Sequence, residues 1–187
     1  THTDHFDPAG QKFLQQHNIP VVCSYPDKGY MQKWGLKVLE GLSPWQPRPF
    51  LEGQITAVPA MHGHTWTRHL MANGIGIFVE LPDEPSIYIA GDTVFTANVQ
   101  NALTRLKPDI CVVAAGGAGL DLGGPILMPL EEVIRFVETA PGKVVANHME
   151  ALNHCPMTRS RLTQELDRCG LLEKTAIPGD GDTIVFK

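Results

Sequence analysis

This 187-residue sequence has four places where residues of types that can bind a metal ion lie close together. The candidates are His2, Asp4, His5, His62, His64, Asp92, His148 and His154. Neutral imidazole and carboxylate groups are ligands for Zn, Mn or Fe, and such a metal lowers the pKa of a bound water towards neutrality. These residue types therefore indicate hydrolysis by a metal-activated water.

Each candidate taken alone also has a structural interpretation. A single histidine near the end of a strand is more often a surface or hydrogen-bonded residue than a ligand. Asp92, in Gly-Asp-Thr, is of a type common in turns and helix caps, and His154 is equally well explained as a residue at a helix start. The run His2-Thr3-Asp4-His5 is more specific, because three ligating residues seldom fall within four positions by chance. The four clusters together favour a metal site.

The predicted strands place several of these residues at one edge of a sheet. Apolar, β-branched runs predict strands at 54–58, 75–81, 86–90, 109–115, 143–146 and 183–186. His62, Asp92 and His148 each follow one of these strands within a few residues. Because α/β proteins build their sites beyond the carboxyl ends of strands, we expect these side chains to meet.

Helices are predicted between the later strands. Apolar residues recur at helical spacing over 99–106 and 130–137, and Pro129 and Pro141 bound the second of these helices. A third helix is predicted from Thr158, with Leu162, Leu166 and Cys169 facing inward and Gly170 ending it. Nearer the start, we expect a short helix at 11–17, a strand at 21–24 and a loop at 44–49. This order predicts an α/β protein with helices packed outside a sheet.

Composition limits the classes of partner. With 15 basic and 20 acidic residues the net charge is −5, which argues against nucleic acid and anionic membranes, so we expect a small-molecule substrate. The longest nearly apolar run, 110–120, is too short for a membrane span, which needs about 20 residues. The four cysteines form no Cys-x-x-Cys pair, which favours reduced thiols and a cytoplasmic protein.

The motifs and their order resemble the metallo-β-lactamase-fold hydrolases. That family has His-x-His-x-Asp-His, then a histidine, a bridging aspartate and a final histidine, each on a loop after a strand. Residues 1–7 match the first motif from its second histidine onward, 90–93 match the bridging aspartate, and 144–148 match the last ligand. Residues 58–62 are similar to the Pro-Ala-x-His segment of the branch that contains ascorbate-phosphate lactonases and the phospholipase D-type enzymes acting on N-acyl phosphatidylethanolamine.

The resemblance covers essentially the whole chain and implies a four-layer αβ/βα sandwich formed by residues 1–187 as a single domain. It implies up to two divalent ions, with Zn as the first choice and Mn or Fe as alternatives. His2 and His62 would bind one ion, Asp4, His5 and His148 the other, and Asp92 both. The first histidine of the family's motif would precede Thr1, so we expect an N-terminally truncated domain with one strong and one weakened metal site.

The activity that the resemblance implies is metal-dependent hydrolysis of an ester, lactone or phosphodiester bond. Asp4 would bind the metal and orient the attacking water, while His64 or His154 would stabilise the transition state or protonate the leaving group. The alternative is a metal-binding or partner-binding module that is catalytically impaired, because one ligand and its supporting strands are absent. Exposed strand edges would allow a second copy to pair, giving a homo-oligomer.

Overall fold

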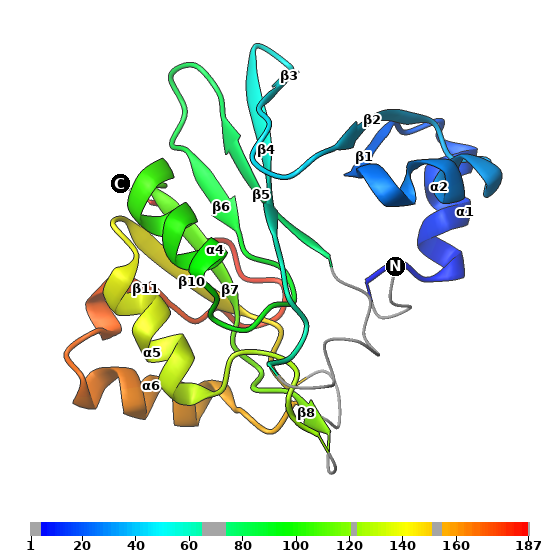
Figure 1. The fold of residues 1–187 in the computed structure, drawn as a ribbon. Coiled ribbons are helices and arrows are strands. Elements are labelled where there is room, and N and C mark those ends of the chain that lie inside the picture. Colours follow the sequence, from blue (N-terminus) through cyan, green and yellow to red (C-terminus); the bar gives the residue numbers. More distant parts are fainter. Residues whose placement is uncertain (1–4, 65–73, 121–122, 151–154, 187) are drawn as a thin grey trace.

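A seven-stranded mixed sheet forms the centre of the protein (Figure 1). The computed structural model describes residues 5–64, 74–120, 123–150 and 155–186. The strand order in the sheet is β11-β10-β7-β6-β5-β4-β3. The bounds are β3 Arg48–Phe50, β4 Gly53–Pro59, β5 Ile75–Glu80, β6 Ile87–Ile89, β7 Ile110–Ala114, β10 Lys143–Asn147 and β11 Thr175–Ala176.

Strand direction determines where the loops of the site meet. Strands β6, β7, β10 and β11 pair in parallel. Strand β5 is antiparallel to both β4 and β6, so β4 runs in the same direction as β6. The carboxyl ends of β4, β6, β7 and β10 therefore lie at the same edge of the sheet. The loops that carry His62, Asp92 and His148 all begin there.

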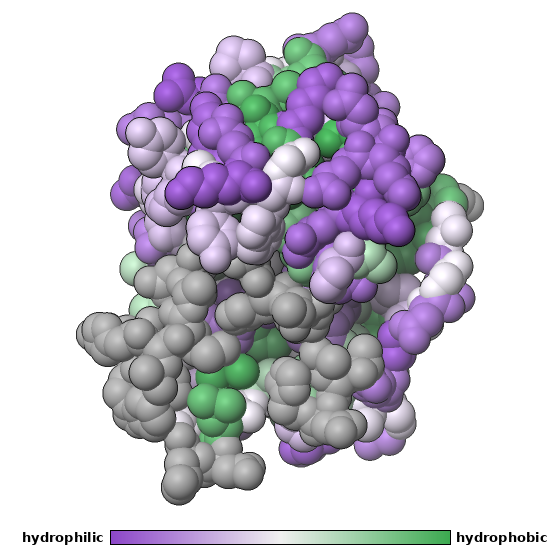
Figure 2. Space-filling model, turned by 90° about the vertical axis from the view of Figure 1, so that its right-hand side faces the viewer, coloured by the Kyte–Doolittle hydropathy of each residue, from purple (hydrophilic) through white to green (hydrophobic). Residues whose placement is uncertain are grey.

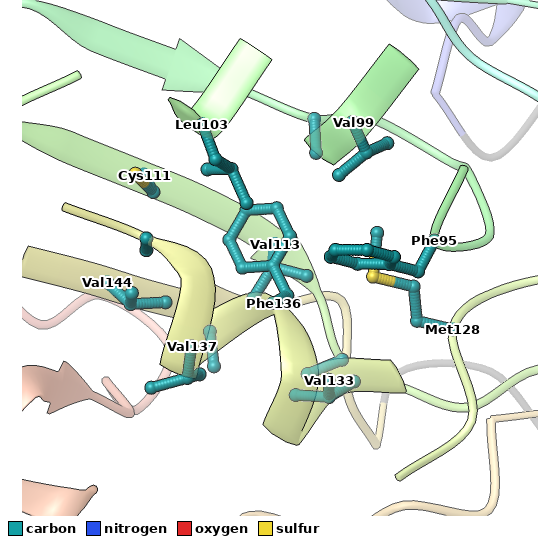
Figure 3. Packing of buried hydrophobic residues seen from close by; sticks show 14 of the residues in the cluster. Phe95, Val99, Leu103, Cys111, Val113, Met128, Val133, Phe136, Val137 and Val144 are labelled. Atoms are coloured by element: carbon teal, nitrogen blue, oxygen red, sulfur yellow. The ribbon is translucent and has the colours of Figure 1, made fainter. Parts of the chain in front are cut away.

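Three helices cover one face of the sheet and enclose the main core (Figure 1). They are α4 (Ala97–Asn101), α5 (Leu130–Thr139) and α6 (Arg159–Arg168), and a π-helical turn over Ala102–Leu106 continues α4. Figure 3 shows Val133, Phe136 and Val137 of α5 among side chains of β7 and β10. These positions follow from the apolar spacing of the sequence. The side chain of Thr158 caps α6 by accepting a hydrogen bond from the Arg161 N–H.

A smaller unit lies on the opposite face of the sheet. It contains α1 (Pro8–Gln16), β1 (Val21–Ser24), a 3₁₀ turn (Tyr25–Asp27), α2 (Lys28–Lys33) and β2 (Val38–Leu42), and β1 pairs in parallel with β2. Leu42 and Val22 of this unit pack against Ile55, Ile75 and Ile77 of the large sheet. Seen from the side of α1 and α2, the surface is mainly hydrophilic, with apolar residues visible between the polar ones (Figure 2).

This arrangement is the mixed α/β fold that the resemblance implies, and most predicted elements lie within two or three residues of the observed ones. Strands β2 and β3 and helix α2 were not predicted. Neither were the two-residue strands β8 (Gly119–Leu120) and β9 (Gly124–Pro125), which pair antiparallel, nor the 3₁₀ turn at Leu172–Lys174.

The strand predicted at 183–186 is wrong. Residues 183–186 have no regular structure, and the Val185 side chain is 78% exposed. The place beside β10 is taken by β11, whose Thr175 pairs with Val144. Strand β11 follows α6 after a short turn, so it reaches the sheet edge before the β-branched residues of the C-terminal segment.

Three of the four cysteines are buried, whereas Cys169 lies where the sequence did not predict it. Cys169 is exposed rather than inward-facing, and it lies one residue beyond α6, which ends at Arg168, as the C-cap of that helix. Burial raises the pKa of Cys111 to about 12, so this thiol stays protonated and unreactive.

No helix in the described parts of the chain is long and apolar enough to cross a membrane.

The α5 contact with the sheet can be tested by a core truncation. Phe136 is fully buried and stacks on Tyr88, with 6.5 Å between the ring centroids. We expect Phe136→Ala to lower the free energy of unfolding by about 3–5 kcal/mol in urea titrations, because it leaves a cavity under α5. Glu138→Ala, on the exposed side of the same helix, is the control. A loss below about 1 kcal/mol for Phe136→Ala would contradict this packing.

Candidate metal site

Four segments meet at the carboxyl edge of the sheet and bring candidate ligands together. They carry His5, which precedes α1, His62 after β4, Asp92 after β6 and His148 after β10. Asp7, two residues after His5, caps α1 with its carboxylate, which accepts a hydrogen bond from the Gly10 N–H. The predicted residues His2, Asp4 and His154 lie outside the described residues.

The Asp92 carboxylate is the centre of this cluster. Its Oδ2 lies 2.9 Å from His5 Nε2 and 3.5 Å from His62 Nε2, and its Oδ1 lies 3.7 Å from His148 Nε2. The rings of His5 and His148 are stacked, with 3.3 Å between their Nε2 atoms. His5, Asp92 and His148 each offer a ligand atom within 4.8 Å of the others, whereas His62 approaches Asp92 without belonging to this group of three.

The chemistry and spacing of this group fit a divalent metal ion. Ligand atoms about 2.0–2.1 Å from a tetrahedral zinc ion lie about 3.3 Å from one another, and the distances among His5, Asp92 and His148 fall on both sides of that value. Asp92 Oδ1 is buried and accepts no hydrogen bond from any of the described residues. A buried carboxylate oxygen needs a donor or a cation, so a metal ion fits this position.

The environment of Asp92 keeps its carboxyl group ionised. Burial raises the pKa of this group, but the hydrogen bonds and charges of His62, His5 and His148 outweigh burial and lower the pKa from 3.8 to about 2. Only 15% of the side chain is exposed to solvent. The site therefore holds a negative charge at every pH relevant to catalysis, as a metal ligand requires.

The loop after β10 turns sharply to direct His148 into the cluster. His148 has a φ of 58°, in the left-handed region that non-glycine residues seldom adopt. Its carbonyl oxygen passes so close to Gly116 that a Cβ there would lie 2.2 Å from it, so only glycine fits at position 116. Cys155 Sγ lies 3.7 Å from His148 Nδ1 and holds the far side of the ring.

The loop after β4 is attached to the Asp92 loop by backbone hydrogen bonds. The Met61 N–H donates to Thr93 Oγ1 at 3.0 Å, and the Val94 N–H donates to the Met61 carbonyl at 2.9 Å. Gly63, with a φ of 99°, reverses the chain between His62 and His64. As a result His62 is buried and faces Asp92, whereas His64 is 39% exposed and faces α5.

Glu132 is a residue of this region to which the sequence assigned no role. It lies in the first turn of α5, where its Oε1 pairs with His64 Nε2 and its Oε2 accepts a hydrogen bond of 2.6 Å from the Phe95 N–H. One carboxylate thus joins the loops after β4 and β6 to α5. An acidic residue at a helix start is too common for the sequence to single it out.

The cluster borders an apolar cavity of about 480 Å³. His5 is one of its lining residues, and its walls come from both the small unit and the large sheet, including Val22, Met31, Ile75 and Ile77. A ligand in this cavity would contact the His5 imidazole and mainly apolar side chains, together with Ser24 and Asp27.

A mixed α/β sheet with a histidine–aspartate cluster at its carboxyl edge defines a class of metal-binding protein, and comparison with known proteins identifies the family. The family described as "Beta-lactamase superfamily domain" matches residues 1–149, so the chain belongs to the beta-lactamase superfamily. The UPF0173 protein YddR of Bacillus subtilis is 29% identical over 188 residues, which cover 99% of this chain and 73% of that protein.

Two solved structures resemble the whole chain. An isothiocyanate hydrolase from Delia radicum gut bacteria is 31% identical, with a TM-score of 0.87 over all of this chain and 74% of its own. A possible metal-dependent hydrolase from Veillonella parvula is 26% identical, with a TM-score of 0.89 over all of this chain and 73% of its own. These relatives support a metal-dependent hydrolase in general, and a divalent metal as its cofactor.

The proposed ligand group can be tested by metal titration. We expect Asp92→Asn to weaken Zn²⁺ binding about 100-fold or more in calorimetry, because it removes the negative charge that the three histidines surround. Asp109→Asn is the matched control, since Asp109 directly precedes β7 at the opposite edge of the sheet, where its carboxylate accepts hydrogen bonds from Ser86. Equal affinities for Asp92→Asn and the wild type would exclude Asp92 as a ligand.

Proposed function

We propose that this protein is a hydrolase that adds metal-activated water to an electrophilic carbon or phosphorus atom. The observation that carries the proposal is the convergence of His5, His62 and His148 on one half-buried, ionised carboxylate, Asp92. A divalent metal at such a centre supplies Lewis acidity and lowers the pKa of a water. Zn is the first choice because imidazole and carboxylate suit it, with Mn or Fe as alternatives.

We assign the metal-binding and proton-transfer roles to the following residues of this chain. His5, Asp92 and His148 would form one ligand set, completed by Asp4, and His62 would serve a second set with His2 and the shared Asp92. Asp4 would also orient the attacking water. His64, exposed and held by Glu132, or His154 would supply a proton to the leaving group. A cytoplasmic location, a single domain and a homo-oligomer stay predictions.

Among substrate classes, an isothiocyanate with an apolar organic group has specific support. The isothiocyanate hydrolase is 31% identical over this whole chain, and the cavity that His5 lines is mainly apolar. In this reaction the water oxygen bonds to the central carbon of the isothiocyanate, and both water protons pass to its nitrogen. The carbon–nitrogen bond then breaks, giving an amine and carbonyl sulfide. The ester, lactone and phosphodiester bonds predicted from sequence remain the alternatives for the same chemistry.

The experiment is a substrate panel with the metal-loaded chain. Benzyl isothiocyanate, a simple lactone, a nitrophenyl ester and bis(nitrophenyl) phosphate would each be assayed with Zn²⁺, Mn²⁺ or Fe²⁺. We expect turnover of at least one substrate, lost on chelation and lowered about 100-fold or more in Asp92→Asn but kept in Asp109→Asn. Benzyl isothiocyanate is expected to give the highest kcat/KM.

Two outcomes would contradict the proposal. Turnover that persists after chelation would exclude a metal-activated water. Tight, stoichiometric metal binding without turnover of any substrate would favour the second candidate, a metal-binding or partner-binding module on the same fold that is catalytically impaired.

A further inference from the structure

We propose that Glu132 is a positioning residue that fixes the orientation and tautomer of His64. The part of this inference that concerns turnover rests on the proposed hydrolase function. Glu132 lies on α5, and the sequence assigned it no role in the site. Its two carboxylate oxygens have different partners, His64 Nε2 and the Phe95 N–H.

The contacts of Glu132 fix it from two sides. The Phe95 N–H bond of 2.6 Å holds one oxygen, and Phe95 itself is buried, with the Arg135 guanidinium 4.5 Å from the centroid of its ring. Phe95 is three residues after Asp92, and His64 is two residues after His62. Glu132 therefore sets the position of His64 relative to both the Asp92 loop and helix α5.

The chemistry of the pair determines which nitrogen of His64 carries hydrogen. An ionised carboxylate can only accept hydrogen bonds, so His64 Nε2 must be the donor. In the neutral ring the lone pair is then on Nδ1. This arrangement, a carboxylate that fixes the tautomer of a histidine, is the means by which acidic residues prepare histidines for proton transfer in hydrolases. The exposed part of His64 is accordingly presented with Nδ1 as its basic atom.

Glu132→Gln and Glu131→Gln form a matched pair of variants. Both remove one negative charge from the first turn of α5, so any effect through the helix dipole is the same. Glu131 is exposed and does not contact His64 or Phe95 in the described hydrogen bonds. In Glu132→Gln the new side-chain oxygen would still accept from the Phe95 N–H, while the new amide group would donate to His64 and so favour the opposite tautomer.

The first measurement needs neither metal nor activity. In the metal-free chain labelled with ¹⁵N-histidine, the imidazole nitrogen shifts at about pH 8 report the tautomer, and His64→Gln identifies the His64 signals by their loss. We expect hydrogen on Nε2 in the wild type and Glu131→Gln, and a shift towards hydrogen on Nδ1 in Glu132→Gln. An unchanged His64 tautomer in Glu132→Gln would overturn the inference.

The second measurement is a double-mutant cycle with whichever substrate the wild type turns over. We expect His64→Gln and Glu132→Gln each to lower kcat about 10-fold or more, with little change in KM and Zn²⁺ affinity, because neither variant removes a metal ligand. The double variant should be no slower than His64→Gln. Losses that multiply would mean that Glu132 acts independently of His64, which contradicts a positioning role.

The two measurements separate the two proposals. If the wild type turns over no substrate, the proposed hydrolase function fails, and the tautomer measurement still decides whether Glu132 fixes His64. If the wild type is active but the tautomer is the same with and without the Glu132 carboxylate, the inference about Glu132 fails and the hydrolase function stands.

Discussion

The arrangement of this end of the molecule depends on one half-buried negative charge, the Asp92 carboxylate. Asp92 sits at the carboxyl edge of the sheet with only 15% of its side chain exposed, and removing a carboxylate from water is costly unless nearby groups compensate it. Three imidazoles on three different loops provide that compensation and lower its pKa to about 2 despite burial. Each loop has to follow a path that keeps its histidine against this carboxylate.

Several local backbone features and hydrogen bonds hold the loops around Asp92 in place. The left-handed backbone at His148 and the close passage of its carbonyl over Gly116 are strained or restrictive features at the end of a regular strand. The hydrogen bonds between Met61, Thr93 and Val94 fasten two loops that would otherwise move separately. Glu132 adds a link to α5, which is itself fixed by Phe136 and its neighbours in the main core. The core therefore determines the geometry of the polar edge.

The sequence predicts the middle of the protein well, because its signals there are local. Alternating and continuous apolar runs identify β4 to β7 and β10, and the common direction of β4, β6 and β10 follows once their pairing is known. His62, Asp92 and His148 were therefore expected to meet, and they lie side by side around the carboxylate. The ligand roles assigned to them remain predictions that metal titration decides.

The features that the sequence did not predict depend on distant contacts. The segment at 183–186 has the residue types of a strand, but the sheet edge is already occupied by β11. Glu131 and Glu132 are adjacent residues of the same type. Glu132 is distinguished by its contacts with His64 and the Phe95 N–H, which depend on how distant segments fold. Cys169 has helical spacing from Leu162 and Leu166, yet α6 ends just before it.

The most direct test of the account is the position of the metal itself. Crystals of the chain grown with Zn²⁺ would be measured with X-rays above and below the zinc absorption edge, and the anomalous difference would locate the ion. We expect an anomalous peak bound by His5 Nε2, His148 Nε2 and a carboxylate oxygen of Asp92. A zinc ion bound only elsewhere on the chain, with the Asp92 carboxylate surrounded by histidines alone, would contradict it.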